Sequence, residues 1–480
     1  MDEVYTHFPK IYTFLMFFYG SPTPTFFQKD TGETKVIFSE EGVQQGDVMG
    51  PALFCIGLKP VLDRLSNRLR EQHRSKSTFI GAFMDDVGLI FPSGGLSRAW
   101  VAAEEEFRSF NLKLNLGKDK SLAFSPAWVE TERCPKTSHA GLKLSKDGFK
   151  LGGGAIGKCE YKKKHFEEVR DEAVGLASKV ANYRDPQGGW LLFRFYVLPK
   201  LGFLLCLMAD AIPTSMWQAA DDMLLKKCTR GLGIAENEWT LHQTVQASLP
   251  LSQRGLGIHR YSLMQKCALV GCYASCLADV LKRLLVQRYA NNPDEMWKKV
   301  SREGWSQKAQ EAFYRLQNDH QNAVSGAPER SLLKASWRDC TEAWRGEGAK
   351  GVQGRLYDTL QAATRKRLLG ELPGSSHPTL ETPPSLDEKG QICLRSCSGN
   401  GASAWLGAIP FDSNHKIFPP LFRTAMRVRL GLRIPELVRQ PVFAAADRGG
   451  TWRVFMEENV QREEVRGEGT KRLGQHFLSC

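Results

Sequence analysis

The chain has 480 residues, of which 42% are hydrophobic and 10% aromatic; these are the values of globular proteins and exclude a largely disordered chain. A chain of this length supports two to four domains. Its formal net charge is +13, which suits a polyanionic partner because nucleic-acid affinity comes largely from neutralised phosphates. Basic proteins with other partners are also common, so charge alone does not decide the partner.

The N-terminal residues, the apolar stretches and the cysteine spacing together predict an intracellular protein. The first three residues include two acids, which argues against a signal peptide. The most apolar long stretch, residues 190–212, contains Arg194, Lys200 and Asp210, so we expect no membrane span. Twelve irregularly spaced cysteines favour a reduced intracellular protein over a disulfide framework, and a nuclear location is compatible with this.

The first forty residues predict a helix followed by a hairpin. Residues 2–19 form an apolar, helix-like segment. Residues 25–29 and 35–39 are strand-like and flank a turn that contains Asp30.

A glycine-rich loop and a long helix come next. Residues 41–54 read E-G-V-Q-Q-G-D-V-M-G-P-A-L-F, and glycines at this spacing suit a loop whose backbone a ligand approaches closely. Asp47 is the expected N-cap of the helix that follows. Apolar residues from Leu53 to Leu65 recur at helical spacing.

Two adjacent acids interrupt the next apolar segment. Residues 79–91 read F-I-G-A-F-M-D-D-V-G-L-I-F, so Asp85 and Asp86 lie between two strand-like runs. Unpaired carboxylates are costly to bury, but they become favourable if they hold a divalent cation. Carboxylate-held Mg²⁺ pairs are the standard device of nucleotidyl transfer. The alternative is a polar β-turn with a solvated Asp-Asp tip.

The loop and the hairpin together resemble the reverse transcriptases of non-LTR retrotransposons. The two motifs that show this resemblance are Q-G-D-x-x-G-P-x-L-F and, about thirty residues later, F-M-D-D. The resemblance implies that Gln45 and Gly46 contact the incoming nucleotide and the template, and that Phe83 and Met84 lie in the same hairpin near the primer end. It also implies that Asp85 and Asp86 are catalytic ligands of Mg²⁺ or Mn²⁺, and that the partners are an RNA template and a DNA primer.

The resemblance continues downstream. Residues 112–121 (L-K-L-N-L-G-K-D-K-S) are similar to the family's next motif, with Asn115 and Lys118 at matching positions. Lys118 is therefore expected to protonate the leaving pyrophosphate; the alternative is a helix-to-strand turn with solvated lysines. Residues 151–157 resemble the turn toward the primer grip, and residues 246–258 a stretch found after the thumb.

The family's first catalytic motif, a strand whose aspartate bridges both metals, has no counterpart here. Asp2 and Asp30 both lack the strand context. The fingers are also missing. We therefore expect a reverse transcriptase fragment that is inactive alone.

The expected fold class is α+β. A partial right-hand polymerase palm, an antiparallel sheet with helices, occupies residues 1–157. A thumb-like helical region follows at 158–240 and a helical region at 241–345. Residues 346–390 form a linker with one helix, and residues 391–480 a small C-terminal module.

Smaller features accompany these regions. Basic residues cluster at 158–164 and 226–230, and three cysteines at 267–276 are expected to be buried thiols. His476 and Cys480 resemble the end of a zinc module whose leading cysteines are not visible.

Three functions fit these motifs. The first is RNA-directed DNA synthesis by a retrotransposon enzyme, and the second is a non-catalytic nucleic-acid-binding remnant. The third, a viral RNA-dependent RNA polymerase, usually carries Gly-Asp-Asp, so Met84 and the Q-G-D loop argue against it. The oligomeric state stays open.

Overall fold

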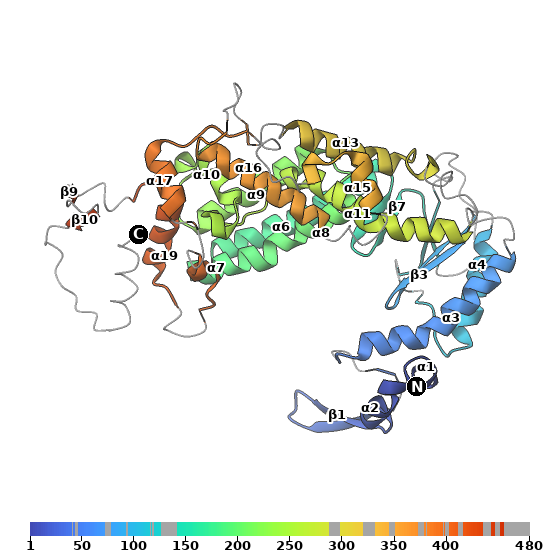
Figure 1. Cartoon of the computed structure of the whole chain (residues 1–480). Coiled ribbons are helices and arrows are strands. Elements are labelled where there is room, and N and C mark those ends of the chain that lie inside the picture. Colours follow the sequence, from blue (N-terminus) through green and yellow to red (C-terminus); the bar gives the residue numbers. More distant parts are fainter. Residues whose placement is uncertain are drawn as a thin grey trace. The chain divides into compact units, whose positions relative to one another are not determined.

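The computed structural model describes most of the chain. The described residues are 1–40, 42–43, 47–72, 78–92, 95–115, 117, 120–125, 142–287, 298–319, 332–344, 351–372, 379–380, 382–396, 398, 403–410, 416–434, 443–446 and 452–455. The chain divides into two compact units, one of Met1–Gly152 with Ile156–Lys158 and one of Gly153–Ala155 with Cys159–Cys480 (Figure 1). The division falls at β8 (Gly154–Gly157), close to the expected end of the palm at 157.

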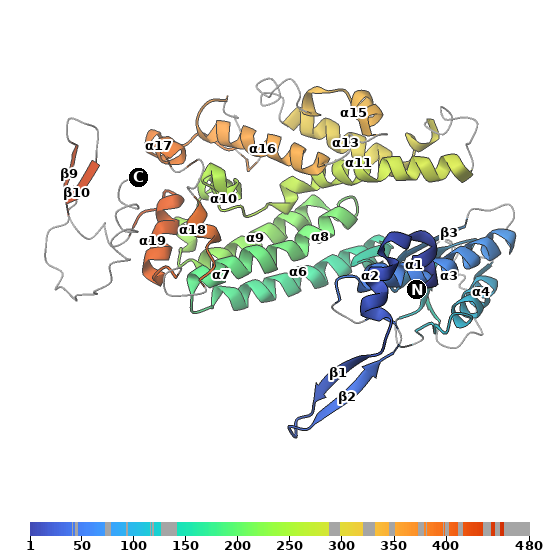
Figure 2. The same cartoon turned by 60° about the horizontal axis from the view of Figure 1, so that its bottom comes forward.

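The first unit begins with two short helices and a hairpin. These elements are α1 (Asp2–His7), α2 (Pro9–Tyr19), β1 (Thr23–Gln28) and β2 (Thr34–Ser39). The strands pair in antiparallel register from Thr23–Ser39 to Gln28–Thr34, and Figure 2 shows the hairpin extending away from α2. Its large side chains are open to solvent, with Phe26 68% and Phe38 58% exposed.

Two helices form the core of this unit and carry a second hairpin. The elements are α3 (Gly50–Gln72), β3 (Phe79–Phe83), β4 (Asp86–Ile90) and α4 (Leu96–Arg108). Leu58, Val61, Leu65 and Leu69 recur along one side of α3 and pack against Ala99, Ala102, Ala103 and Phe107 of α4. Arg68 of α3 also pairs with Glu105 and Glu106 of α4.

The expectation of one antiparallel sheet is wrong in its details. Within the described residues the strands form only two-stranded sheets. Moreover β5 (Leu122–Phe124) and β6 (Lys143–Ser145) pair in parallel. A parallel pair needs a long crossover, and the residues between 124 and 143 provide one. β7 (Gly148–Leu151) follows.

The second unit is helical and has one large core. Its elements are α6 (Cys159–Ala181), α7 (Pro186–Leu192), the π-helix η2 (Phe193–Val197), α8 (Leu198–Met208), α9 (Thr214–Gly231) and α11 (Tyr261–Gln287). Phe166, Leu201 and Trp217 are fully buried where α6, α8 and α9 lie side by side (Figure 2). Asp185 accepts a hydrogen bond from the Gln187 N–H and so caps α7, at the break that the sequence indicates.

A buried carboxylate caps the start of α11. Asp221 of α9 accepts hydrogen bonds from the backbone N–H groups of Tyr261 (2.8 Å) and Ser262 (3.0 Å) and from the Ser262 hydroxyl (2.6 Å). These donors are otherwise orphaned at a helix N-terminus. Burial nevertheless raises the pKa of Asp221 to about 6.

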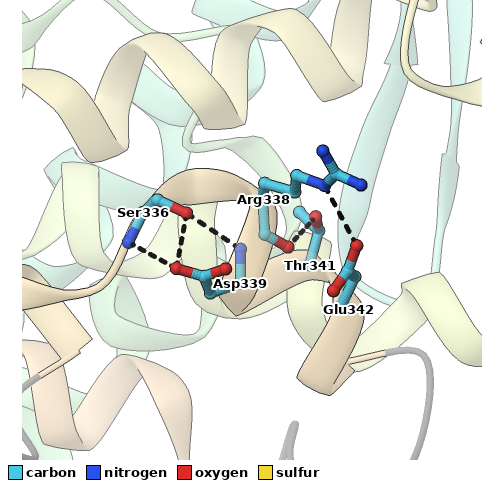
Figure 3. Close-up of polar contacts among 5 residues, drawn as sticks. All are labelled: Ser336, Arg338, Asp339, Thr341 and Glu342. Carbon is cyan, nitrogen blue, oxygen red and sulfur yellow. Dashed lines mark hydrogen bonds and ion pairs between the residues drawn. The ribbon is translucent and has the colours of Figure 1, made fainter.

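Aromatic side chains join the other side of α11 to a second core. The packing elements are α13 (Gly304–Asp319), η5 (Leu332–Lys334), α15 (Trp337–Trp344) and α16 (Val352–Leu368). Tyr273 of α11 lies against Trp305, Trp337 and Trp344. Figure 3 shows how α15 begins: the Asp339 N–H donates to the Ser336 hydroxyl, and that hydroxyl donates to the Asp339 carboxylate.

The remaining described helices belong to the same unit. They are η3 (Glu236–Glu238), α10 (Leu241–Ser248), η4 (Leu251–Gln253), α17 (Glu388–Ser396), α18 (Ala404–Gly407) and α19 (Pro419–Arg429), with the hairpin of β9 (Phe443–Ala446) and β10 (Trp452–Phe455) beyond. Leu406, Phe422, Met426 and Leu430 belong to the same core as α6 to α9. His476 and Cys480 lie outside the described residues.

Two expectations about the helices need comment. Cys267 is buried as expected, but Cys276 is exposed, because positions nine residues apart point to different sides of α11. By length and composition, residues Pro186–Met208 could cross a membrane; their buried side chains, such as Leu201 and Leu205, are also what the core helix of a soluble protein presents. This is weak evidence for a span.

Candidate active site

The two adjacent acids lie at the turn of a β-hairpin. β3 and β4 pair in antiparallel register, with Phe83 opposite Asp86, so Met84 and Asp85 form a two-residue turn. Both aspartates are exposed. The carboxylates are thus presented to solvent at the tip of a paired element, where a cation can reach them.

The turn contains a strained backbone position. Met84 has φ 55°, in the left-handed region that favours glycine and disfavours side chains with a Cβ. Two-residue hairpin loops need such a conformation to match the twist of their strands. Strain of this kind is commonly found at functional sites, where surrounding contacts hold it in place.

One face of the hairpin packs on the helices and fixes the turn. Ile80, Val87 and Leu89 lie on the same face by strand alternation and contact the core of α3 and α4. The contacts of this face with α3 and α4 therefore fix the position of the hairpin, while its turn remains exposed.

The middle of the opposite face carries two glycines, with Phe79 and Ile90 on the same face at the far end of the ladder. Gly81 and Gly88 pair directly across the ladder, on the face that also carries Asp86. A Cβ on Gly81 would come within 2.9 Å of the Phe79 ring. Paired glycines in a β-ladder let another backbone approach closely, and Gly81 and Gly88 lie on the same face as the Asp86 carboxylate.

Asp47 lies ahead of α3 but is not its N-cap as expected, since the first hydrogen bond of the helix runs from the Leu53 N–H to the Met49 carbonyl. The Asp47 carboxylate accepts a hydrogen bond from the Met49 N–H at 2.9 Å, and the Tyr19 hydroxyl donates to the same carboxylate. Asp47 therefore organises the chain ahead of α3 and joins it to α2.

Several predicted site residues fall outside the description. Gln45, Gly46 and Lys118 lie outside the described residues, and of Phe83 only the backbone at the end of β3 is described. Their roles stay predictions. Asn115 is described: its side-chain oxygen accepts from the Gly117 N–H, and its carbonyl accepts from the Ser121 hydroxyl. It therefore shapes a turn.

The donor set at the hairpin turn fits a hard cation but is small. Exposed carboxylate oxygens are what Mg²⁺ and Mn²⁺ prefer, and a hydrated ion needs few protein ligands. Over the described part of the chain, however, no group of three or more His, Cys, Asp or Glu residues could hold a metal ion. Among the described residues, Asp85 and Asp86 therefore have no further His, Cys, Asp or Glu side chain placed to share a metal ion with them.

The sequence profile of the family described as "Reverse transcriptase (RNA-dependent DNA polymerase)" matches residues 5–147. The segment is related to reverse transcriptases. No match was found among curated proteins or among solved structures. The matched range contains the glycine-rich loop, α3 and the Asp85–Asp86 hairpin, so this ancestry implies a nucleic-acid template and primer and divalent metal ions.

Sequence reasoning found the two acids but missed the glycine pair. Gly81 and Gly88 lie equally far from the turn, so a hairpin centred on Met84 and Asp85 brings them together. The signal was present, but it has meaning only once the register of the hairpin is known.

Proposed function

We propose that residues 1–157 are the partial palm of a non-LTR retrotransposon reverse transcriptase, which copies an RNA template into DNA from a DNA primer. The observation that carries the proposal is a pair of adjacent exposed aspartates at the turn of a supported hairpin, inside a segment related to reverse transcriptases.

In the proposed reaction the 3′-hydroxyl of the primer attacks the α-phosphate of the incoming nucleotide, and pyrophosphate leaves. Asp85 and Asp86 would hold Mg²⁺, which when bound stabilises negative charge on the reacting oxygens. Gln45 and Gly46 would shape the nucleotide pocket, and Lys118 would donate a proton to the leaving group. Met84 would lie beside the primer end.

We further propose that these 480 residues do not complete the site. Two carboxylates supply limited negative charge for two divalent ions that repel each other. The third carboxylate would come from a fingers and first-motif segment that the chain lacks. We expect the chain alone to retain one metal ion weakly and to extend no primer.

The first test is metal binding followed by the Mn²⁺ electron paramagnetic resonance signal. We expect Asp85→Asn to weaken Mn²⁺ binding about tenfold, because one ligand charge next to a divalent ion is lost. The matched control is Asp222→Asn, an exposed acid on α9 of the second unit. Equal loss in both variants would show general surface binding and contradict the site.

The second test is primer extension. The chain alone should give no product, whereas the chain with a first-motif and fingers segment added in trans should extend a primer. Asp85→Ala should abolish the restored synthesis. Asp85-dependent synthesis by the unsupplemented chain would contradict the need for another carboxylate, and Asp30, Asp47 and Asp119 would be the first acids to examine.

The alternative is a nucleic-acid-binding remnant without chemistry, and the charge of +13 favours it equally. In both cases primer–template binding should weaken steeply with salt, and the cluster Lys162, Lys163 and Lys164 should contribute to the slope. Replacing all three by Gln should make the negative slope of log K against log salt shallower by about 2–3. An affinity that does not change with salt would count against both functions.

A further inference from the structure

An exposed strip of apolar side chains runs along one helix of the second unit. η2 and α8 form a continuous helix whose inner side lies in the large core. Leu192, Phe195, Tyr196, Phe203 and Leu207 are exposed on it, with Phe195 63% and Tyr196 56% exposed. Leu192 is the last residue of α7, and spacings of three or four residues join it to Phe195 and Tyr196. Spacings of seven and four residues join Tyr196 to Phe203 and Phe203 to Leu207, so these side chains lie on one side of the helix.

Two cations lie over the aromatic rings of this strip. The guanidinium carbon of Arg194 is 5.0 Å from the centre of the Phe195 ring. The Lys200 ammonium is 5.8 Å from the centre of the Tyr196 ring, and it also pairs with Glu172 at 2.6 Å. Each ring is thus exposed and has a positive charge over one of its two faces.

Arg194 differs from Lys200 because it has no carboxylate beside it. In the described part of the chain no acid lies within 4.0 Å of its guanidinium. It is only half-exposed, and burial lowers its pKa. Its Nε lies 4.0 Å from the position that a Cβ would take on Gly257, and burial together with the Arg194 charge lowers the pKa of His259.

A partly desolvated cation with a second basic group and no acid nearby is suited to an anionic ligand. The exposed rings beside it are suited to a flat ligand, because every nucleobase has a face that stacks on an aromatic ring. A chain of unpaired nucleotides carries both an anionic phosphate and a flat base in each of its units.

We propose that the surface formed by Arg194, Phe195, Tyr196 and Lys200 binds single-stranded nucleic acid, with unpaired bases stacked on the two rings and the backbone phosphate at Arg194. The inference rests on the proposed function for the class of partner and adds a second site, in the second unit. RNA and DNA share the recognised chemistry.

The same strip has two other conceivable occupants. A lipid surface prefers an apolar face with its cations at the rim, whereas here the cations lie over the rings themselves. A second copy of this chain would bring another +13 of charge to the surface. Charge complementarity therefore favours nucleic acid.

The experiment measures fluorescence anisotropy of labelled oligo(dT) and oligo(rU) with the full chain in EDTA, so that no chemistry contributes. We expect Phe195→Ala and Tyr196→Ala each to weaken binding at least about fivefold, since stacking on one ring is lost. The control Tyr314→Ala removes an aromatic ring that is 45% exposed on α13, and it should change affinity less than about twofold.

Further variants separate stacking from charge and from folding. Phe195→Leu keeps the apolar bulk but removes the ring, so it should weaken binding as Phe195→Ala does. Arg194→Gln should make the negative slope of log K against log salt shallower by about 0.7, whereas Arg194→Lys should leave the slope unchanged. Unchanged circular dichroism and melting temperature should accompany the Phe195 and Tyr196 variants, because these side chains are exposed, and the same measurements show whether the Arg194 variants stay folded.

The outcomes are distinct. If the wild-type chain binds neither oligonucleotide, this site is refuted, whereas the proposed function is tested separately by binding of a primer–template. If it binds both but the ring variants bind equally well, only this site is refuted. Loss of vesicle binding or of a dimer in Phe195→Ala, with oligonucleotide binding unchanged, would also overturn the proposal. Preference for oligo(rU) or for oligo(dT), lost in the ring variants, supports it and identifies the strand.

Discussion

At the scale of single residues, Asp221 is the carboxylate whose surroundings say most about stability. It caps α11 with three hydrogen bonds, yet burial raises its pKa from 3.8 to about 6. Desolvation therefore outweighs the hydrogen bonds and the nearby Arg260 guanidinium, which both favour the ionised form.

The raised pKa predicts a pH dependence. Below pH 3.8 the carboxyl is protonated in both states, and above about 6 it is ionised in both. Between these values the folded protein holds the proton that the unfolded chain has lost, so stability falls as pH rises. The Asp221 contribution should decrease by up to about 3 kcal/mol over this range.

Urea unfolding of the wild type and of Asp221→Asn from pH 4 to 7 measures this. The amide does not titrate, so the difference between the two free energies of unfolding should shrink toward pH 6 and then stay level. A difference that is constant with pH would contradict a raised pKa.

The sequence revealed some residues of this kind and not others. Asp85 and Asp86 were found because they are adjacent and interrupt an apolar run. Asp221 meets Tyr261, forty residues away, only after α9 and α11 have packed. A single polar residue on an amphipathic helix carries no sign of such a partner.

At the scale of elements, the docking of α19 depends on buried arginines. Arg254 is 1% exposed and donates to the carbonyls of Arg429 (2.6 Å) and Val428 (2.5 Å). Gln246 also donates to the Arg429 carbonyl, at 2.7 Å. These donors satisfy carbonyls that a helix leaves unpaired at its C-terminus.

We therefore expect Arg254→Met to loosen α19. The Arg429 and Val428 carbonyls would each lose one donor and keep another, from Gln246 and from the Gly431 N–H, so the loss should be about 1.5–3 kcal/mol for each hydrogen bond to the charged guanidinium. Hydrogen exchange over residues 419–429 should become faster, while exchange in α6 changes less. The control is Arg338→Met, whose side chain is 86% exposed. Equal acceleration in both variants would contradict the anchoring role of Arg254.

Sequence patterns predicted these elements better than their partners. The sequence also predicts a helix near residues 420–430, and the structure has α19 at Pro419–Arg429. Its pattern says that one face is buried but not against what. Phe422 and Met426 pack into the core of α6 to α9, whereas the sequence suggested a small separate module at 391–480.

At the scale of the whole molecule, the two units have separate cores of different size. In the first unit Leu65 and Phe107 belong to a small cluster formed by α3 and α4. In the second, Phe166 and Trp217 belong to a far larger one. The resemblance of residues 151–157 to a turn of the family put the expected end of the palm close to this division. The restriction of the described strands to two-stranded sheets did not follow from strand patterns alone, because pairing partners are not encoded locally.

We expect the units to unfold in two calorimetric transitions. Leu65→Ala should lower the midpoint of one transition and Phe166→Ala that of the other, since each deletes fully buried atoms at a cost of about 2–5 kcal/mol. The exposed Tyr183→Ala serves as the control. A single transition that both core variants shift together would contradict independent cores.

The exposed hairpin of β1 and β2 has a consequence for the life of the protein in a cell. It presents Phe26, Phe27, Ile37 and Phe38 to solvent on a ladder with two open edges. Chaperones and quality-control proteases recognise such uncovered strands. The abundance of the protein would then depend on whether something covers this hairpin, so a binding partner would first be noticed as an increase in half-life.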